Sequence, residues 1–300
     1  MVKNTKAYNF FKSVNTLFMV LIVVVCVFPY LHTLAKSLND GYDTMLGGIT
    51  FYPRKFTWQN FSVLFKDISM YKAFILSVVR VIIGTFLGIA VQFAGAYALS
   101  KDYLRGRKKL MLFLIVPMFF NGGVIPTYLL FAKSNLINSF LVYILPMLAS
   151  YYNVLVIQSF IKSSIPESLG ESAALDGANE FRILWQIVFP LCKPVLATIA
   201  LWLAVSHWND WTSTMYYVTK ESLFTLQYKL MQIVKESERL KALIQEAALA
   251  GETLSAESIR STPESLVSAQ VIITTIPIIV VYPFLQKYFV QGVTLGAVKG

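Results

Sequence analysis

Long apolar runs separated by polar segments are the dominant pattern along the chain. Because a helix rises about 1.5 Å per residue, about 20 consecutive apolar residues cross the roughly 30 Å hydrocarbon core of a bilayer. The runs of this length cover residues 14–34, 73–99, 110–132, 136–160, 187–208 and 266–289. The pattern therefore predicts six transmembrane helices, and the even number places both termini on the same side of the membrane.

The two longest polar segments after the fourth run differ in character. Residues 161–186 form an inner segment, and residues 209–265 form a longer outer segment. Between Phe224 and Ala250 the apolar residues of the outer segment recur about every 3.6 positions. This spacing predicts one or two amphipathic helices that lie against the outer ends of the bundle.

The composition agrees with a membrane protein and excludes most soluble classes. Of 300 residues, 56% are hydrophobic and 14% are charged, whereas soluble domains average about 25% charged residues. The mean hydropathy is +0.60. We therefore expect an all-α fold, a polytopic bundle that forms a single transmembrane domain over residues 1–300.

Basic residues gather in two places that the span count puts on the same side. They are Lys3, Lys6 and Lys12 in the N-terminal tail, and Lys101, Arg105, Arg107, Lys108 and Lys109 in the loop 100–109. Because Lys and Arg are enriched in cytoplasmic loops, both termini are predicted to be cytoplasmic. The net charge of +10 then reflects the cytoplasmic edge of a bundle in a lipid bilayer and does not indicate a nucleic-acid partner.

Acidic residues are missing from the interiors of the predicted spans, because all 16 Asp and Glu lie in tails, loops or span ends. An ion-coupled secondary transporter usually needs such a group, although backbone carbonyls can replace it for sodium, so this alternative stays open. The chain also lacks a P-loop, a G-x-S-x-G elbow, and Cys/His clusters at metal spacing, which disfavours a membrane-embedded enzyme. We expect no catalytic residue, metal or cofactor on this chain, so energy for uphill transport must come from another subunit.

Three features stand out inside the second predicted span. Arg80 is a strong charge near its outer end, and it either snorkels to the outer headgroups, lines a water-filled path, or pairs with another subunit. Gln92 is expected to form hydrogen bonds between helices. Gly84 and Gly88 form a G-x-x-x-G pair that allows another helix to approach closely.

The inner segment has the signals of two short helices joined by a glycine turn. Ser164 and Glu167 have the spacing of a capping box, which predicts a helix from Pro166 to Leu175. Gly177 suits a left-handed cap, and Asn179 can cap a second helix. The small residues of the first helix would allow a partner to approach closely, although an ordinary amphipathic loop explains the spacing equally well.

The motif E-S-A-A-L-D-G-A at residues 171–178, followed by Ile187, Pro190 and Pro194, resembles the EAA loop of permease subunits of binding-protein-dependent ABC importers. Ser172 stands where that family has Ala, and it is also small. The whole chain resembles MalG-type permeases of carbohydrate importers, in the LplC-like subgroup. The other matching stretches are N-G-G-V-I-P-T-Y at 121–128, W-N-D-W at 208–211, and the tail 286–300.

This resemblance implies a mechanism and a set of partners. A second homologous permease would complete the path, two cytosolic ATPases carrying ATP and Mg would bind the EAA loops, and an extracellular sugar-binding protein would deliver an oligosaccharide or polysaccharide fragment. The chain would lie in a bacterial cell membrane, with residues 161–186 as the cytoplasmic coupling loop. The implied ATPase-coupling residues are Glu171, Ala173, Ala174, Asp176, Gly177, Ala178 and Pro190.

Two clusters are candidates for the substrate path, in addition to Arg80. Trp208, Asn209, Asp210 and Trp211, at the outer end of the fifth span, combine ring faces and polar groups that suit sugars, but an aromatic belt explains them as well. His207 beside them is expected to be a belt or packing residue. Asn121, Gly122 and Gly123, with Pro126, interrupt the third span, and a broken helix is tolerated only where it is buried or lines a cavity.

Overall fold

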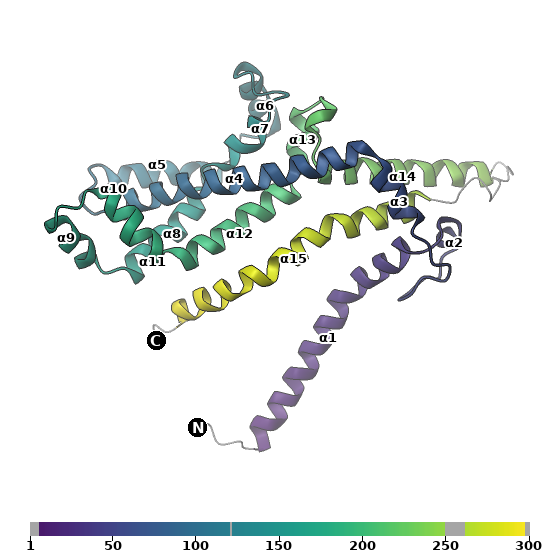
Figure 1. The fold of residues 1–300 in the computed structure, drawn as a ribbon, viewed down its shortest axis with the longest axis horizontal. Helices are drawn as coiled ribbons and strands as arrows, with labels where there is room; N and C mark the ends of the chain where they lie inside the picture. Colours follow the sequence, from purple (N-terminus) through teal and green to yellow (C-terminus); the bar gives the residue numbers. More distant parts are fainter. Residues whose placement is uncertain (1–5, 121, 250–261, 298–300) are drawn as a thin grey trace. The chain divides into compact units, whose positions relative to one another are not determined.

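The computed structural model describes residues 6–120, 122–249 and 262–297, and in these ranges every regular element is a helix (Figure 1). An isolated bridge pairs Asn39 with Phe56. The helices group into two compact units, one made of residues 1–68 and 230–276 and the other of residues 69–229 and 277–300. The expected all-α fold is confirmed.

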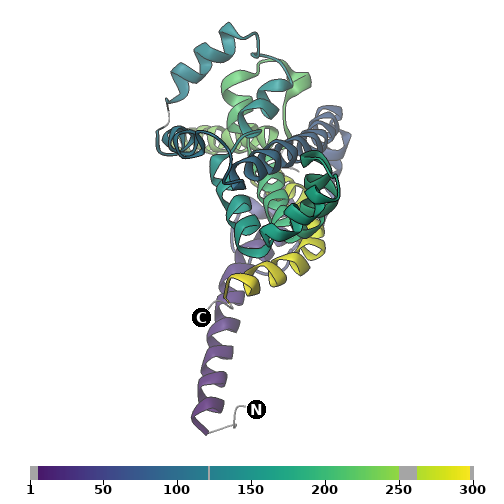
Figure 2. The ribbon, with the colours of Figure 1, turned by 90° about the vertical axis from the view of Figure 1, so that its left-hand side faces the viewer.

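The first unit is built on long helices and a buried polar cluster. It contains α1 (Lys6–Ser37), which Figure 2 shows as one continuous helix, with α2 (Gly41–Met45), α3 (Gln59–Lys66), most of α14 (Leu226–Leu249) and the first part of α15 (Pro263–Ala297). Asn60 is fully buried and donates to the carbonyls of Ser37 and Asn39, while Ser265 donates to its side-chain oxygen. These bonds join α1, α3 and α15.

The second unit contains the remaining helices. They are α4 (Ile68–Ser100), α5 (Arg107–Phe119), α6 (Val124–Lys133), α7 (Leu141–Ile144), α8 (Tyr151–Ser164), α9 (Glu167–Leu175), α10 (Glu180–Arg182), α11 (Phe189–Leu191), α12 (Lys193–Asn209) and α13 (Thr212–Tyr217). A π-helical stretch, Ile183–Val188, joins α10 to α11. The core of this unit includes Ala96, Ile157 and Ile199, which are fully buried on α4, α8 and α12.

Glycines let α12 approach α4 closely, as the G-x-x-x-G pair predicts. An ideal Cβ on Gly84 would lie 2.3 Å from His207 Nε2, and one on Gly88 would lie 3.0 Å from a Leu203 methyl carbon. A side chain at either position would therefore push the helices apart. Gly84 makes the room that the His207 ring occupies.

The predicted hydrogen-bonding role of Gln92 is confirmed. Its side-chain amide donates to the carbonyls of Met147 and Leu148, at 3.2 and 3.0 Å, and accepts from Asn153 at 2.9 Å. The carbonyls lie in the break between α7 and α8, where helical bonding is interrupted. Gln92 thus satisfies polar backbone groups inside the bundle.

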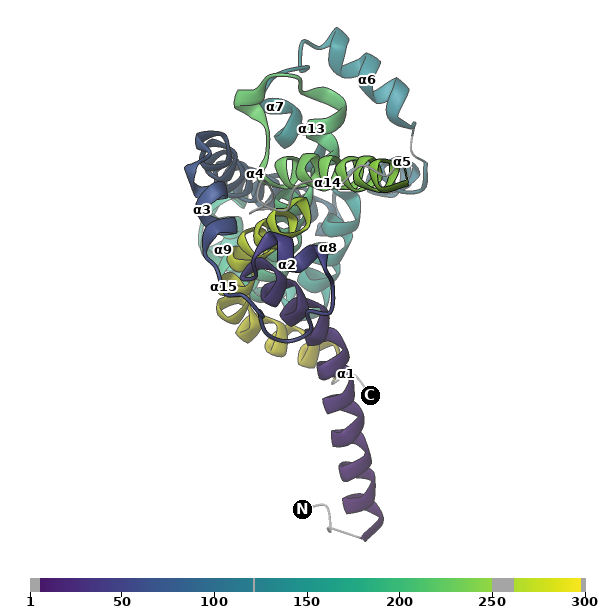
Figure 3. The same cartoon turned by 90° about the vertical axis from the view of Figure 1, so that its right-hand side faces the viewer.

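Three described helices are long and apolar enough to cross a membrane, and there are six if each of three bent helix pairs makes one span. The predicted ranges 14–34, 73–99 and 266–289 lie within α1, α4 and α15. The range 110–132 corresponds to α5 and α6, which Figure 3 shows as separate helices. The ranges 136–160 and 187–208 each correspond to a bent pair.

Two of these predictions need correction in detail. Residues 136–140 are not helical: Asn138 has a left-handed backbone, and its side-chain oxygen accepts from Thr219 N at 2.6 Å. The fifth span bends by 82° between Leu191 and Lys193. Pro194 has no N–H to donate to the preceding turn, so it favours this break.

The outer segment is partly as predicted. The amphipathic pattern between Phe224 and Ala250 corresponds to one helix, α14. Residues 250–261 lie outside the described residues. The prediction of a single domain over residues 1–300 stays a prediction.

Candidate functional site

The inner segment forms two short helices joined by a glycine turn, as the sequence predicts. Helix α9 ends at Leu175, and Gly177 follows with a φ of +82°. The N–H of Gly177 donates to Ala174 O and that of Ala178 to Ala173 O, at 3.0 and 2.9 Å. This bonding pattern is a Schellman motif, in which a left-handed residue closes the helix end. Gly at residue 177 therefore reverses the chain without the strain that a side chain would bring.

The beginnings of the two helices are held differently. The predicted capping box is wrong, because α9 begins at Glu167 after Pro166, and the Ser164 hydroxyl contacts only that of Ser163 among the described residues. By contrast, the Asn179 side chain accepts from Arg182 N at 2.8 Å. Asn179 thus caps α10, as predicted.

Of the predicted coupling residues, two pack against the core of the second unit and the others are exposed. Ala173 and Ala178 are half-buried and pack against the core of the second unit. The Schellman turn brings both inward, and their role in ATPase coupling stays a prediction. Leu175 is 90% exposed and Phe181 is 71% exposed. These two large apolar side chains were not among the sequence candidates, and their hydrophobicity beside the glycine turn was the available signal.

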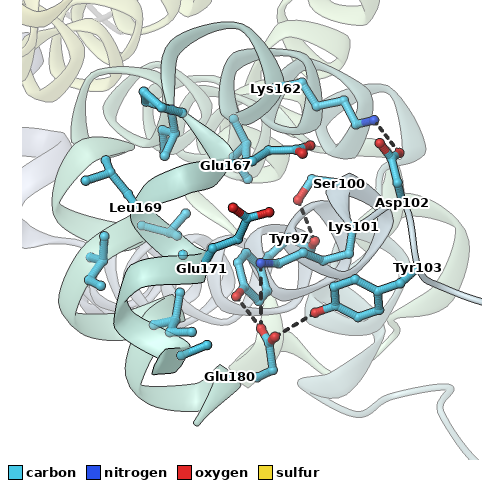
Figure 4. Close-up of a pocket in the computed structure, with 18 residues that line it drawn as sticks. Tyr97, Ser100, Lys101, Asp102, Tyr103, Lys162, Glu167, Leu169, Glu171 and Glu180 are labelled. Atoms are coloured by element: carbon cyan, nitrogen blue, oxygen red, sulfur yellow. Dashed lines mark hydrogen bonds and ion pairs between the residues drawn. The ribbon is translucent and has the colours of Figure 1, made fainter. Parts of the chain in front are cut away.

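The other coupling candidates are exposed. Ala174 and Glu171 line a cavity of about 240 Å³ between α9 and the end of α4, and Figure 4 shows the Glu171 carboxylate pointing into it. Asp176 is the C-terminal capping residue of α9, and Pro190 lies on the surface of α11. The roles of these residues in coupling stay predictions.

A second carboxylate at this cavity, Glu180, is held by groups from the end of α4 and the loop after it. It accepts from the hydroxyl of Tyr97, accepts from that of Tyr103 at 2.6 Å, and lies 3.8 Å from the ammonium of Lys101 (Figure 4). The Tyr103 and Tyr97 hydrogen bonds favour the ionised form and hold the pKa of Glu180 below its usual value. The same contact with Glu180 raises the pKa of Tyr103 to about 12. We call Glu180, Tyr97, Lys101 and Tyr103 the Glu180 bracket.

A third carboxylate, Asp102, belongs to a separate network beside the bracket. It accepts from Lys162 of α8 at 2.8 Å and pairs with Arg107 at the start of α5. The Lys162 hydrogen bond and charge, together with Arg107, lower the pKa of Asp102. This network ties the loop after α4 to α5 and to Lys162 in the last turn of α8. Among the described residues it forms no hydrogen bond or ion pair with α9, the Gly177 turn or α10.

Arg80 is fully buried and forms an ion pair with Asp210, which is 9% exposed. Its guanidinium also donates to Asp210 O at 2.9 Å and lies 4.5 Å from the Tyr143 ring centroid. Snorkelling to the headgroups is therefore wrong in this structure, because the guanidinium is buried and its acidic partner lies on the same chain. A role of Arg80 in the substrate path or towards another subunit stays a prediction. A cation inside a span usually pairs with an acidic side chain. The sequence analysis did not pair Arg80 with Asp210, although Asp210 lies at the outer end of the fifth span.

The remaining residues of the W-N-D-W cluster have different exposures. Trp208 is 6% exposed and packs edge-on against Phe74, so its ring is covered by the chain's own helices. Asn209 is exposed, and Trp211 is half-buried. Trp208 therefore packs against the chain's own helices in this structure, and the path roles of these four residues stay predictions.

The predicted interruption of the third span coincides with the break between α5 and α6. Gly123 has a φ of +84° and precedes α6 directly, and Gly122 is exposed. Asn121 lies outside the described residues. A path-lining role for this segment stays a prediction. In the described part of the chain, no three His, Cys, Asp or Glu residues lie together as a metal site.

Similar proteins cover almost the whole chain. It is 32% identical to Protein LplC of Bacillus subtilis over 297 residues, which is 99% of this chain and 97% of the relative. It is 33% identical to the polygalacturonan/rhamnogalacturonan transport system permease protein YtcP of Bacillus subtilis, over 94% of this chain and 96% of the relative. No family model matches the chain.

A solved structure shows the same fold. It is a chain of a bacterial ABC transporter involved in the import of the acidic polysaccharide alginate. The two structures share a TM-score of 0.83 and 26% sequence identity, over 96% of this chain and 100% of the other.

Proposed function

This chain belongs to the family of carbohydrate ABC transporter permeases, and from this premise we propose how it works in a complete importer. It forms, with a homologous second permease, the path for an oligosaccharide or polysaccharide fragment. Cytosolic ATPases bind its coupling loop and supply the energy. An extracellular binding protein delivers the sugar, and this chain itself catalyses no reaction.

The observation that carries the proposal is the exposed tip of the coupling loop. Leu175 and Phe181 are 90% and 71% exposed on either side of the Gly177 turn. Leu169 and Trp185 of the same loop are also exposed, and several large apolar side chains exposed together outside a bilayer favour a protein interaction site. Ala173 and Ala178 anchor the same turn to the core, so a partner that binds the tip can move the helices behind it.

The orientation of the chain follows from this role. ATPases that bind residues 161–186 must be cytoplasmic, so the basic loop 100–109 that lines the same cavity through Lys101 and Tyr103 is also cytoplasmic. This agrees with the enrichment of Lys and Arg in cytoplasmic loops. We therefore propose that both termini are cytoplasmic.

The class of sugar is supported by the relatives. YtcP is a permease of a polygalacturonan/rhamnogalacturonan transport system, and the solved relative belongs to an importer of alginate. Other relatives are permeases for arabinooligosaccharides and for melibiose, raffinose and stachyose. Binding of a glycan panel to the cognate binding protein tests the class, and selective binding of non-carbohydrate ligands would contradict it.

A pair of glycine substitutions tests the coupling role. Gly177 and Gly106 have φ values of +82° and +76°, and an added Cβ at either would meet nothing within 4 Å. Replacement by Val brings the same strain of about 1–2 kcal/mol at both sites. We expect Gly177→Val to reduce uptake by the reconstituted complex at least about tenfold, whereas Gly106→Val, outside the coupling loop, retains most of it. Equal uptake by the two variants would contradict the coupling role.

A further inference from the structure

The coupling loop contacts α4 mainly after the Gly177 turn, and a cavity separates much of α9 from the end of α4. Beneath α9 lies the cavity of about 240 Å³, into which Glu167 and Glu171 point (Figure 4). Among the described residues, neither side chain forms a hydrogen bond or an ion pair. An open space transmits little force, so a load on α9 passes mainly through Ala173 in its last turn, which packs against the core, and through the Gly177 turn that follows.

After the Gly177 turn, the chain meets α4 in two ways. The first contact is apolar: Trp185 and Phe189 pack against Phe93, with ring centroids 6.4 and 5.8 Å apart. The second contact is the Glu180 bracket, which joins the first residue of α10 to Tyr97 and Tyr103. The two contacts differ in the directions of force that they resist.

Apolar packing is non-directional, so it resists compression but allows surfaces to slide. Hydrogen bonds to an ionised group depend on distance and angle, and they are roughly twice as strong as neutral ones. The bracket therefore resists both separation and sliding of the loop against α4. Glu180 is held from two directions, because Tyr97 belongs to α4 and Tyr103 to the loop beyond it.

The position of Tyr97 links the bracket to the core of the span. Tyr97 is 7% exposed and lies one residue after the fully buried Ala96. Lys101 lies over the Tyr97 ring at 4.7 Å and approaches Glu180 as well. The bracket thus joins an exposed loop to a buried point on the longest helix of the second unit.

We propose that Glu180 is a positioning residue for transport: it fixes the coupling loop to the end of α4, so that movement of the loop moves α4. This inference rests on the proposed function, since it requires ATPases that move the loop. Glu180 does not itself form the ATPase-facing tip, because its carboxylate is occupied by groups of its own chain. Its loss should therefore leave ATPase binding intact and lower the amount of sugar moved for each ATP hydrolysed.

The experiment uses the complete importer, reconstituted in vesicles with its binding protein. Sugar uptake and ATP hydrolysis are measured together for the wild type, Glu180→Ala, Tyr103→Phe, and the combination of Glu180→Ala with Tyr97→Phe and Tyr103→Phe. We expect Glu180→Ala to lower the ratio of sugar to ATP about tenfold, and Tyr103→Phe to lower it less. The combined variant should be no worse than Glu180→Ala, because all three changes break one bracket.

Asp102→Asn is the matched control. Asp102 is also an exposed carboxylate that lines the cavity and pairs with cations, but its partners Lys162 and Arg107 lie on α8 and α5, outside α9, the Gly177 turn and α10. We expect this variant to keep the wild-type ratio. An equal loss in Asp102→Asn, a wild-type ratio in Glu180→Ala, or loss of the ATPase subunit from the Glu180→Ala complex would each overturn the inference.

The same experiment separates the two proposals. If the proposed function fails, the wild-type chain itself will carry no ATPase or show no uptake driven by ATP. If only the inference about Glu180 fails, the wild type will be coupled and the Glu180 variants will be coupled equally well.

Discussion

Two carboxylates in the second unit are held by groups of their own chain in opposite environments. Asp210 pairs with Arg80, and the two side chains are 9% and 0% exposed. Glu180 is held by Tyr97, Tyr103 and Lys101 while its side chain stays 58% exposed. The first pair closes α4 against the end of α12, whereas the second fastens a surface loop to α4.

The difference in burial separates their roles. Removing one partner of a buried pair leaves an uncompensated charge, at a cost of about 3–5 kcal/mol. Exposed ion pairs contribute about 0–1 kcal/mol, because water replaces the partner. Removing either Arg80 or Asp210 alone is therefore expected to destabilise the fold. The Glu180 bracket can be broken without unfolding the chain, which suits a contact that works during transport.

The largest effect is expected where the buried pair is broken. Asp210→Asn leaves the Arg80 guanidinium without its counter-charge and should destabilise the chain by about 3–5 kcal/mol. The thermal unfolding midpoint and the monodisperse yield of the detergent-solubilised protein measure this loss. Adding Arg80→Gln removes the second charge and should restore part of the stability. An unchanged midpoint in Asp210→Asn would contradict the assignment.

The next effect concerns the close approach that places α12 beside α4. Gly84→Ala puts a Cβ only 2.3 Å from His207 Nε2, and overpacking of this kind costs about 1–3 kcal/mol. Gly95→Ala on the same helix is the control, because its Cβ would meet only a Val154 methyl carbon at 3.9 Å. Unfolding midpoints that fall equally in both variants would show that the contact with His207 is unimportant.

A smaller effect is expected when the exposed bracket is tested for stability. Glu180→Gln keeps the shape of the side chain and removes its charge, so it should lower the stability by at most about 1 kcal/mol. The same unfolding assay measures this. A loss as large as that of Asp210→Asn would remove the contrast between the two sites.

The smallest effect is expected from pH. The pKa of Glu180 is held below its usual 4.5 by Tyr103 and Tyr97. A lowered pKa stabilises the folded state above the usual value, and this contribution is lost only as the pH falls through the lowered one. Between about pH 6 and about pH 8, Glu180 therefore stays ionised, and the bracket should cause little change in the ratio of sugar moved to ATP hydrolysed. A bracket-dependent step in this range, absent from Glu180→Ala, would contradict the ionisation assigned to Glu180.

Features set by local sequence could be predicted, and features set by long-range contacts could not. Apolar run length located the helices, Gly177 marked the turn, and Asn179 marked the cap, because each depends on neighbouring residues. The Arg80–Asp210 pair joins residues 130 positions apart, and the Glu180–Tyr97 contact joins residues 83 apart. Nothing in the local pattern says which loop folds back to which span.

The breaks within spans lie between these two cases. Gly122 and Gly123 indicated where helical bonding could fail in the range 110–132. The break before Pro194 was not predicted, because hydropathy reads the range 187–208 as one continuous run. The inward direction of Ala173 and Ala178 followed from the Schellman turn. This direction could not be predicted from the sequence, because it depends on the exact residue at which α9 ends.

The central claim is that ATPases bind the exposed tip of the coupling loop, and the most direct test is co-purification. The tagged full-length chain is isolated from its native membranes as wild type and as Leu175→Glu, which puts a charge on the side chain that is 90% exposed. We predict that the wild type retains an ATPase and a second permease, and that Leu175→Glu retains the second permease but loses the ATPase at least about tenfold. Equal amounts of ATPase with both chains, or none with the wild type, would contradict the account.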